Sequence, residues 1–425
     1  MKEYLMREFN IDEWVIDLVN SEEALLKDRF SGFNAALEVN QYKILKSLQK
    51  NRISDMHFSW TTGYGYGDIG REAAEKVYAD VFNTEAALVR PNIVNGTHAI
   101  ACTLFGILRP GDQLIYASGK PYDTLEEVIG NNGNGFGTLR DYGVTYDYVP
   151  LKDNHIDKEA LTDKINDKTK VVAIQRSVGY DYRKAIALSE IKNITETIHG
   201  LNKDIIVMVD NCYGEFVYDK EPTDYGVDIM AGSLIKNPGG GLALTGGYIV
   251  GRRDLIDNIS YRMTCPGIGS ECGLTFGQTR NVLQGLFLAP KTVNGALKGS
   301  ILCGAVFNKV GFEICPDISD ERSDIIQAIK FNDPDIMVAF CQGIQSASPV
   351  DSHVAPMPWD MPGYKDQVIM AAGAFVQGSS IELSADAPLR APFIAYYQGG
   401  LTYEHCKFGV IKALDELVKR GYVKL

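Results

Sequence analysis

Short apolar segments alternate with helical segments between residues 114 and 233, and this alternation constrains the fold more than any other feature of the chain. The apolar runs have the length of buried strands and cover residues 114–117, 144–149, 171–174 and 205–209. The intervening segments, such as 158–165 and 189–199, carry apolar residues at helical spacing. Strands that alternate with helices predict an α/β fold with a mostly parallel sheet sandwiched by helices.

An acid and a lysine follow two neighbouring strands of this predicted sheet. The run 205–209 ends in Asp210, and the next segment leads from Val227 to Lys236, behind which comes the glycine-rich stretch 239–241. Such a pair suits an enzyme of pyridoxal phosphate, since the amine forms a Schiff base with the aldehyde and the acid keeps the pyridine nitrogen protonated. Either residue alone is more simply a turn cap or a solvated lysine, but the combination favours the cofactor site.

Other polar residues stand where strands end or a helix begins. Tyr122 follows the strand 114–117, and Ser177 follows the strand 171–174. Because ligands of open α/β sheets bind beyond the carboxyl ends of the strands, these residues belong to the candidate site. Asn95 and Gly96 begin a predicted helix, whose free N–H groups and positive dipole end would suit a phosphate. An ordinary N-cap by Asn95 explains the same residues equally well.

Composition narrows the class of protein. The 425 residues are 45% hydrophobic and carry a net charge of −12, which argues against nucleic acid or an anionic membrane as partner. Eight cysteines without a CxxC pair suit a reducing compartment, and six histidines without HExxH spacing give no support for a metal site. No signal peptide and no membrane-spanning run is visible, so we expect a soluble, cytoplasmic protein.

The chain divides into three predicted regions. Residues 1–56 form a helical N-terminal arm, residues 57–308 a large cofactor-binding domain, and residues 309–425 a smaller α+β domain. Within these regions we expect two strands that turn at Gly246 and Gly247. The other expectations that bear on the fold are helices over 270–288 and 293–307 broken at Pro290, a helix over 325–331 and a strand over 336–340.

Five motifs together resemble a known family. YGYGDIGRE, NGTHAI, VDNCYGEF, SLIKNPGGG and SIELSADAPLRAPF are each weak but specific as a set. They are similar to those of the fold-type I pyridoxal-phosphate enzymes of cysteine and methionine metabolism. The resemblance is closest to the methionine gamma-lyase-like or aluminium-resistance branch, which includes cystathionine beta-lyase-like proteins, and it extends from Trp60 to the C-terminus. It implies the fold of the pyridoxal-phosphate-dependent transferases, with pyridoxal 5'-phosphate as cofactor.

The resemblance also implies a role for each residue that contacts the cofactor. Lys236 matches the Schiff-base lysine, and Asp210 matches the acid on the pyridine nitrogen. Gly96 and Thr97 fall where backbone amides hold the phosphate, and Ser233 matches the hydroxyl that also contacts it.

Further residues match the surroundings of the cofactor and the substrate. Tyr122 matches the aromatic ring that stacks on the cofactor, and Ser177 lies near the polar cluster at a strand end. Arg390 falls where the family places the arginine for the substrate α-carboxylate, a task that suits a bidentate guanidinium. The family carries a tyrosine and an arginine in the loop YGYGD, where Tyr64 takes the place of the tyrosine and Gly65 that of the arginine.

These roles predict a carbon–sulfur lyase that acts on a cystathionine-, methionine- or cysteine-type amino acid through a Lys236 aldimine. Desolvation and nearby positive charge should lower the pKa of Lys236, which then removes the Cα proton before β- or γ-elimination. Tyr122 or Tyr64 protonates the sulfur. The alternatives are an aminotransferase, a γ-replacement synthase, or a non-catalytic binding protein linked to metal stress. The resemblance implies a homotetramer of catalytic dimers, in which the Tyr64 loop crosses the dimer interface.

Overall fold

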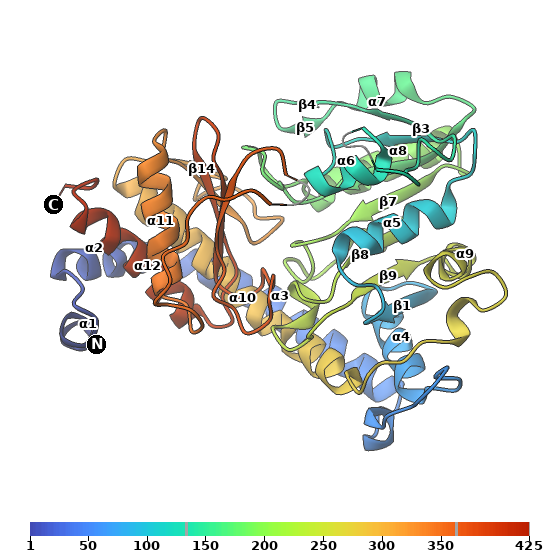
Figure 1. Cartoon of the computed structure of the whole chain (residues 1–425), viewed down its shortest axis with the longest axis horizontal. Coiled ribbons are helices and arrows are strands. Elements are labelled where there is room, and N and C mark those ends of the chain that lie inside the picture. Colours follow the sequence, from blue (N-terminus) through green and yellow to red (C-terminus); the bar gives the residue numbers. More distant parts are fainter. Residues whose placement is uncertain (132–134, 362–363, 425) are drawn as a thin grey trace.

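A seven-stranded sheet forms the larger part of the molecule, as the computed structural model shows for the described residues 1–131, 135–361 and 364–424 (Figure 1). Its strand order is β1 (Ala86–Arg90), β9 (Gly247–Gly251), β8 (Ile229–Ser233), β7 (Ile206–Asp210), β6 (Thr169–Gln175), β2 (Gln113–Tyr116) and β3 (Thr145–Tyr148). Strand β9 runs antiparallel to both of its neighbours, and the other pairs are parallel. The predicted α/β fold with a mostly parallel sheet is confirmed.

Helices cover both faces of this sheet because successive side chains of each strand point to opposite sides. In β7, Val207 and Val209 pack toward one face, and Ile206 and Met208 pack toward the other. The helices of the first face are α4 (Ile69–Val81), α7 (Lys158–Lys164) and α8 (Leu188–Leu201). Those of the second face are α5 (Gly96–Ile107), α6 (Asp123–Ile129) and α9 (Arg253–Met263). A short hairpin, β4 (Leu151–Lys152) and β5 (His155–Ile156), precedes α7.

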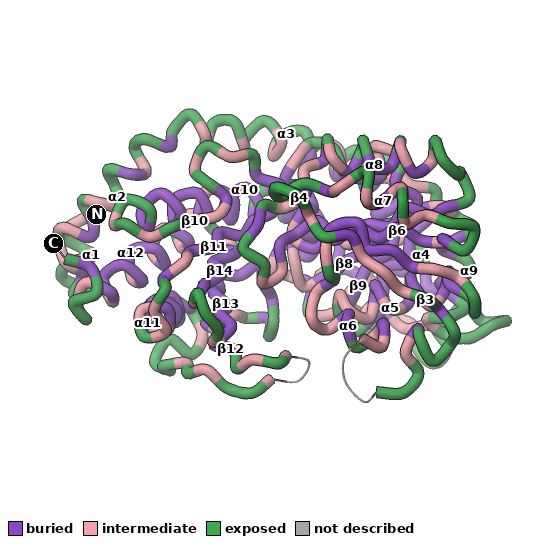
Figure 2. The backbone as a smooth tube through the Cα atoms, turned by 90° about the horizontal axis from the view of Figure 1, so that it is seen from above, coloured by how far each residue is buried: buried purple, intermediate pink, exposed green. Residues whose placement is uncertain are grey.

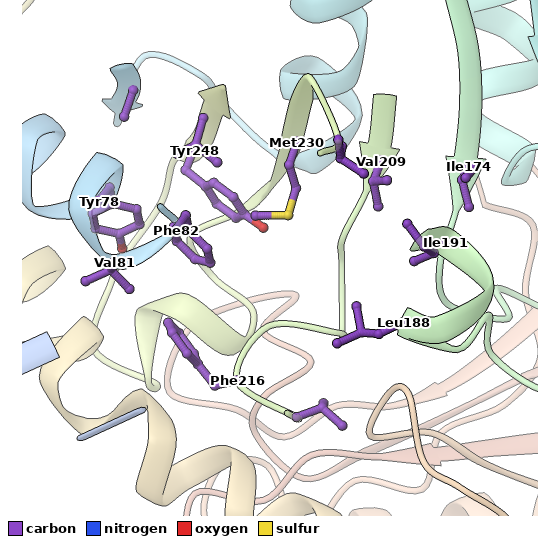
Figure 3. Close-up of a cluster of buried hydrophobic side chains, with 14 of the residues drawn as sticks. Tyr78, Val81, Phe82, Ile174, Leu188, Ile191, Val209, Phe216, Met230 and Tyr248 are labelled. Carbon is purple, nitrogen blue, oxygen red and sulfur yellow. The ribbon is translucent and has the colours of Figure 1, made fainter. Parts of the chain in front are cut away.

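Aromatic side chains concentrate in the core of the first face (Figure 3). The ring of Phe82 stacks on that of Tyr248 with a centroid distance of 5.3 Å, and Tyr78 and Phe216 lie beside them. Rings in such offset arrangements add stabilisation beyond the area they bury. This core lies directly beneath the segments that follow β7 and β8, and it therefore supports the loops that carry Asp210 and Lys236.

A second sheet is entirely antiparallel, with the order β10 (Glu313–Cys315), β11 (Gln327–Lys330), β14 (Ile394–Gln398), β13 (Ser384–Pro388) and β12 (Val368–Ala371). Helix α11 (Pro334–Ser346) packs on it, and α12 (Tyr403–Lys419) packs on α11 and joins the same core. The predictions of a helix over 325–331 and a strand over 336–340 are wrong. Short apolar runs do not distinguish helix from strand, whereas Asp333, whose carboxylate caps α11, and Pro334 at its first turn are a helix start that we overlooked.

One long helix, α10 (Thr279–Lys309), extends along both sheets (Figure 1). We predicted that Pro290 would break it, and this is wrong. Pro290 is buried within the helix, and the packing of its buried face outweighs the hydrogen bond that a proline lacks. We also predicted two strands that turn at Gly246 and Gly247. Only the second strand, β9, forms, and residues 242–245 are not a strand.

The N-terminal residues form three helices that pack on the rest of the chain. They are α1 (Lys2–Phe9), α2 (Glu13–Leu25) and α3 (Lys27–Lys50). Val15, Ile16 and Val19 of α2 join the core beneath the second sheet, and α3 lies beside α10. Helix α3 exposes much of its length, whereas the strands of the large sheet are mostly buried, except the edge strand β3 (Figure 2).

Candidate active site

A cavity of about 240 Å³ opens at the carboxyl ends of β6, β7 and β8. The structure brings seven of the nine predicted site residues to its wall, namely Gly96, Thr97, Tyr122, Ser177, Asp210, Ser233 and Lys236. The second sheet closes the opposite side with residues of β13 and β14, among them Asp386, Tyr396 and Gln398. The cavity therefore lies where the two sheets meet, at the strand ends where α/β folds bind ligands.

Lys236 stands between β8 and a short 3₁₀ helix over Asn237–Gly239. Its Nζ lies 4.1 Å from the ring centroid of Tyr213. Burial acts to lower the pKa of Lys236, but the neighbouring Cys212, Tyr213 and Asp210 raise it by more, and Glu215 adds to this rise only where it is ionised. The predicted lowering of the pKa is therefore wrong for this structure, because the groups around the amine are acids rather than cations.

Asp210 is the last residue of β7, and the loop behind it is firmly held. The N–H of Cys212 donates to Oδ1 of Asp210 at 3.1 Å. Beneath this turn, the buried guanidinium of Arg176 donates to Oδ1 of Asn211 at 2.7 Å, and the amide of Asn211 donates to Oε2 of Glu221 at 3.0 Å. The network holds Asn211, the residue after Asp210, while the N–H of Cys212 orients the Asp210 carboxylate itself.

The N-terminus of α5 faces the same cavity. Oδ1 of Asn95 accepts a hydrogen bond from the N–H of His98 at 2.8 Å, so Asn95 is an N-cap. The first N–H groups of a helix have no acceptor within it, which leaves those of Gly96 and Thr97 for a ligand. The N-cap reading of Asn95 is therefore confirmed, and it is compatible with the phosphate reading, which stays a prediction.

Gly96 allows this helix end to approach β8 closely. A Cβ on Gly96 would lie 3.4 Å from Cβ of Ser233 and 3.5 Å from Sγ of Cys212. The hydroxyls of Ser233 and Thr97 add further polar groups to the cradle, where Thr97 Oγ1 lies 2.9 Å from Thr124 Oγ1. A phosphate group requires hydrogen-bond donors, which the backbone N–H groups and the hydroxyls supply, and the positive end of the helix dipole favours its negative charge. These residues therefore fit the phosphate of pyridoxal phosphate.

Tyrosines form much of the remaining wall. The hydroxyls of Tyr122 and Tyr364 are 2.5 Å apart, and the rings of Tyr122 and Tyr180 have centroids 5.7 Å apart. Burial raises the pKa of Tyr122 well above its usual range, so its hydroxyl is protonated at neutral pH. The amide carbonyl of Gln175 accepts from the N–H of Tyr122 at 2.6 Å and so fixes the start of α6. The flat apolar rings suit an aromatic cofactor.

Three predicted residues lie differently. Ser177 lines the cavity, but its hydroxyl donates to Oδ2 of Asp324 at 2.7 Å. Tyr64 is 72% exposed on a loop outside the cavity, where Arg71 donates to the carbonyl of Gly65 at 2.7 Å. Arg390 is exposed and donates to Asp366 at 3.2 Å, and it lines a separate shallow pocket behind Tyr180 and Tyr396. The structure therefore does not bring Tyr64 and Arg390 to the cavity of their own chain.

Sequence reasoning missed the contribution of the second sheet. Asp386 and Gln398 belong to β13 and β14, and Tyr364 precedes β12. The side-chain amide of Gln398 donates to Oδ2 of Asp386 at 3.2 Å. The sequence offered one weak signal, an acid between two alanines in Asp386, because charged residues rarely occur inside a strand without a partner or a ligand, but this signal does not say which site the acid faces.

The described residues lack two further kinds of feature. No helix there is long and apolar enough to cross a membrane. Within the same ranges, no group of three or more histidine, cysteine, aspartate or glutamate side chains is arranged to hold a metal ion.

Comparison with known proteins gives consistent similarities. Residues 15–418 match the protein family described as methionine gamma-lyase. The uncharacterized protein YnbB of Bacillus subtilis is 53% identical over 388 residues, which span 91% of this chain and 92% of YnbB. L-methionine gamma-lyase of Treponema denticola is 25% identical over 226 residues, or 52% of this chain and 51% of that enzyme.

Solved structures show the same similarity. Two clostridial proteins, both described as involved in aluminum resistance, each match 98% of this chain with 98% of their own. The Clostridium acetobutylicum protein has a TM-score of 0.95 at 50% identity. The Clostridium novyi protein, described as a carbon-sulfur lyase, has a TM-score of 0.94 at 51% identity.

Proposed function

Because the chain belongs to the methionine gamma-lyase family, we propose that it is a pyridoxal-phosphate-dependent carbon–sulfur lyase that acts on a sulfur amino acid. The observation that carries this proposal is the convergence of Lys236, Asp210 and the N-terminus of α5 on one cavity. These three features supply an amine, an acid and a phosphate cradle, which are the groups that the cofactor requires.

The residues of the cavity divide the work of holding the cofactor. The N–H groups of Gly96 and Thr97 and the hydroxyl of Ser233 would hold the phosphate. Asp210 would hold the proton on the pyridine nitrogen, and Tyr122 would cover the ring. When bound, pyridoxal phosphate supplies an electron sink that makes the Cα proton of an attached amino acid acidic.

The same residues account for proton transfer. Lys236 is the only amine among the described residues that line the cavity, so we assign the removal of the Cα proton to its Nζ. The hydroxyl of Tyr122, which lies beside that of Tyr364, is the group we assign to protonation of the departing sulfur.

The test is the release of a keto acid from L-cystathionine by the purified protein loaded with pyridoxal phosphate. Pyruvate would indicate β-elimination, and 2-oxobutyrate would indicate γ-elimination. We expect Lys236→Ala to abolish release, whereas the exposed control Lys309→Ala should retain it. If no sulfur amino acid yields a keto acid while the absorbance of the bound cofactor is normal, the lyase proposal fails and transamination or γ-replacement becomes the activity to assay.

We also propose that the protein works in the cytoplasm as a homotetramer of catalytic dimers. The support is the loop of Tyr64 and Tyr66, whose side chains are 72% and 65% exposed and contact each other rather than the cavity of their own chain. Exposed aromatic residues of this kind are typical of protein interfaces. Light scattering should give four times the chain mass of 46.8 kDa, and a monomer mass would contradict the proposal.

A further inference from the structure

The side chain of Asp386 faces the cavity from β13. Asp386 pairs with Tyr396 across β13 and β14, and Gln398 follows Tyr396 by two positions, so all three share one face of the second sheet. All three line the cavity, and Gln398 donates to Oδ2 of Asp386 at 3.2 Å. The sheet thus presents a carboxylate to whatever occupies this side of the cavity.

This carboxylate has no cationic partner within the described residues, since none of the ion pairs that they form includes Asp386. Burial raises the pKa of Asp386 to about 6, and the hydrogen bond from Gln398, the positive charge of Lys236 and the hydroxyl of Tyr180 offset that rise only in part. A carboxylate in such a place is unfavourable until a cation or several donors reach it. The feature that the site lacks is therefore a positive charge.

The charged residues of the cavity indicate which molecule would supply a positive charge to Asp386. The described lining carries two carboxylates, Asp210 and Asp386, and one amine, Lys236, but no arginine. The proposed function assigns Asp210 to the pyridine nitrogen and Lys236 to the cofactor aldehyde. Asp386 is then left for the substrate, on the wall opposite the strand ends that carry Asp210 and Ser233.

We propose that Asp386 binds a second ammonium group of the substrate, on the far side of its sulfur from the reacting carbon. The substrate class is then a sulfur amino acid with two ammonium groups, such as a thioether that joins two amino acids. This inference rests on the proposed function and narrows it. Asp386 is a specificity residue rather than a catalytic one, because it pairs with the leaving group and takes no part in bond breaking.

Two ligands that differ only in the distal ammonium test this inference without any elimination. L-lysine and L-norleucine share the α-amino acid group and the chain length, and neither contains sulfur. We expect the protein loaded with pyridoxal phosphate to bind L-lysine at least about tenfold more tightly in calorimetry. Asp386→Asn should remove this preference, and Asp386→Ala serves as a second variant. The exposed control Asp181→Asn should retain the preference.

Equal binding of the two ligands by the wild type, or an unchanged preference in the folded Asp386→Asn variant, would overturn the inference. Either result is also expected if Asp386 pairs with the α-ammonium, which both ligands carry. The lyase proposal is tested separately with S-aminoethyl-L-cysteine and S-propyl-L-cysteine. Failure to release pyruvate from both compounds, together with no 2-oxobutyrate or pyruvate from L-cystathionine, would reject the lyase, whereas release at equal kcat/KM would reject only the role of Asp386.

Discussion

At the scale of single residues, Glu215 has the least favourable surroundings of the acids near Lys236. Its side chain is fully buried, and Oε1 accepts a hydrogen bond from the hydroxyl of Tyr248 at 2.6 Å. Its second oxygen, Oε2, has no partner among the described residues. Burial raises the pKa of Glu215 to about 8, so the carboxyl is largely protonated at neutral pH.

This pKa gives a pH dependence with a definite sign. Because the folded-state pKa lies above the unfolded value of 4.5, the contribution of Glu215 to stability is complete below about pH 4.5 and is lost as the pH rises through about 8. One pKa unit corresponds to about 1.4 kcal/mol, so the loss amounts to a few kcal/mol. Glu215→Gln should flatten the fall in unfolding free energy between pH 5 and pH 8, as measured with urea.

The exposed variant Glu3→Gln is the control for this measurement and should follow the wild type at both pH values. Identical pH slopes for Glu215→Gln and the wild type would show that the carboxyl is not held protonated.

Residues also differ in how far the sequence revealed them. Asp210 and Ser233 were predictable because each ends a strand of the parallel sheet, where side chains converge by the geometry of the fold. Asp386 and Gln398 were not, because an antiparallel strand carries no rule that directs one of its faces to a distant site. Only the packing of the second sheet against the first assigns that face to the cavity.

At the scale of elements, the start of α5 makes the phosphate cradle testable. Gly96→Ala would place a methyl group 3.4 Å from Cβ of Ser233, which the empty protein tolerates but which occupies the proposed cradle. We expect a melting temperature close to that of the wild type and about tenfold weaker binding of pyridoxal phosphate, equivalent to about 1.4 kcal/mol. Fluorescence titration of the cofactor measures this affinity.

The matched control is Gly200→Ala in α8, where a Cβ meets no atom within 4 Å. Unchanged cofactor affinity in Gly96→Ala would place the phosphate elsewhere.

Helix α10 contacts the lysine loop through two backbones rather than side chains. A Cβ on Gly285 would overlap the carbonyl oxygen of Gly239, three residues after Lys236. Gly285→Ala should therefore destabilise the protein by about 1–3 kcal/mol in urea unfolding, since nothing flexible is available to move aside. Gly32→Ala in α3 has open space and should instead stabilise by about 0.5–1 kcal/mol. Equal effects of the two substitutions would contradict this packing.

Helices and strands were predicted correctly where the apolar residues recur with a clear helical or strand period, and less well elsewhere. The alternation of strands and helices as far as β7 was predictable because the strands are apolar and the helices between them are amphipathic. The structure contains these strands and helices. Helix α10 was divided at Pro290 because the local rule for proline ignores the packing of a buried helix face. Strand β11 and helix α11 were exchanged because each segment is too short for its period to decide.

At the scale of the whole molecule, the two sheets are joined across the cavity by tyrosine hydroxyls. Tyr122 precedes α6 on the large sheet, Tyr364 precedes β12 of the second sheet, and their oxygens are 2.5 Å apart. Tyr364→Phe removes one hydrogen bond, which contributes about 1 kcal/mol net. We expect KM for the sulfur substrate to rise about fivefold, with little change in melting temperature.

The variant Tyr182→Phe, in the neighbouring shallow pocket, serves as the control and should leave KM unaltered. A lower melting temperature for Tyr364→Phe at constant KM would mean that the hydroxyl pair has a structural role alone.

The path of α10 also bears on how such a protein can be dissected or recombined. The helix begins beneath the lysine loop and ends beneath the second sheet, where Ile301, Val306 and Phe307 belong to that sheet's core. A fragment that starts at residue 309 would lack the side chains of α10 that complete the core of the second sheet. A fragment that ends at residue 309 would expose the apolar side chains at the end of α10 to water. We therefore expect that the second sheet does not fold without the C-terminal half of α10. A chimera that exchanges this sheet between relatives should exchange that half of α10 as well.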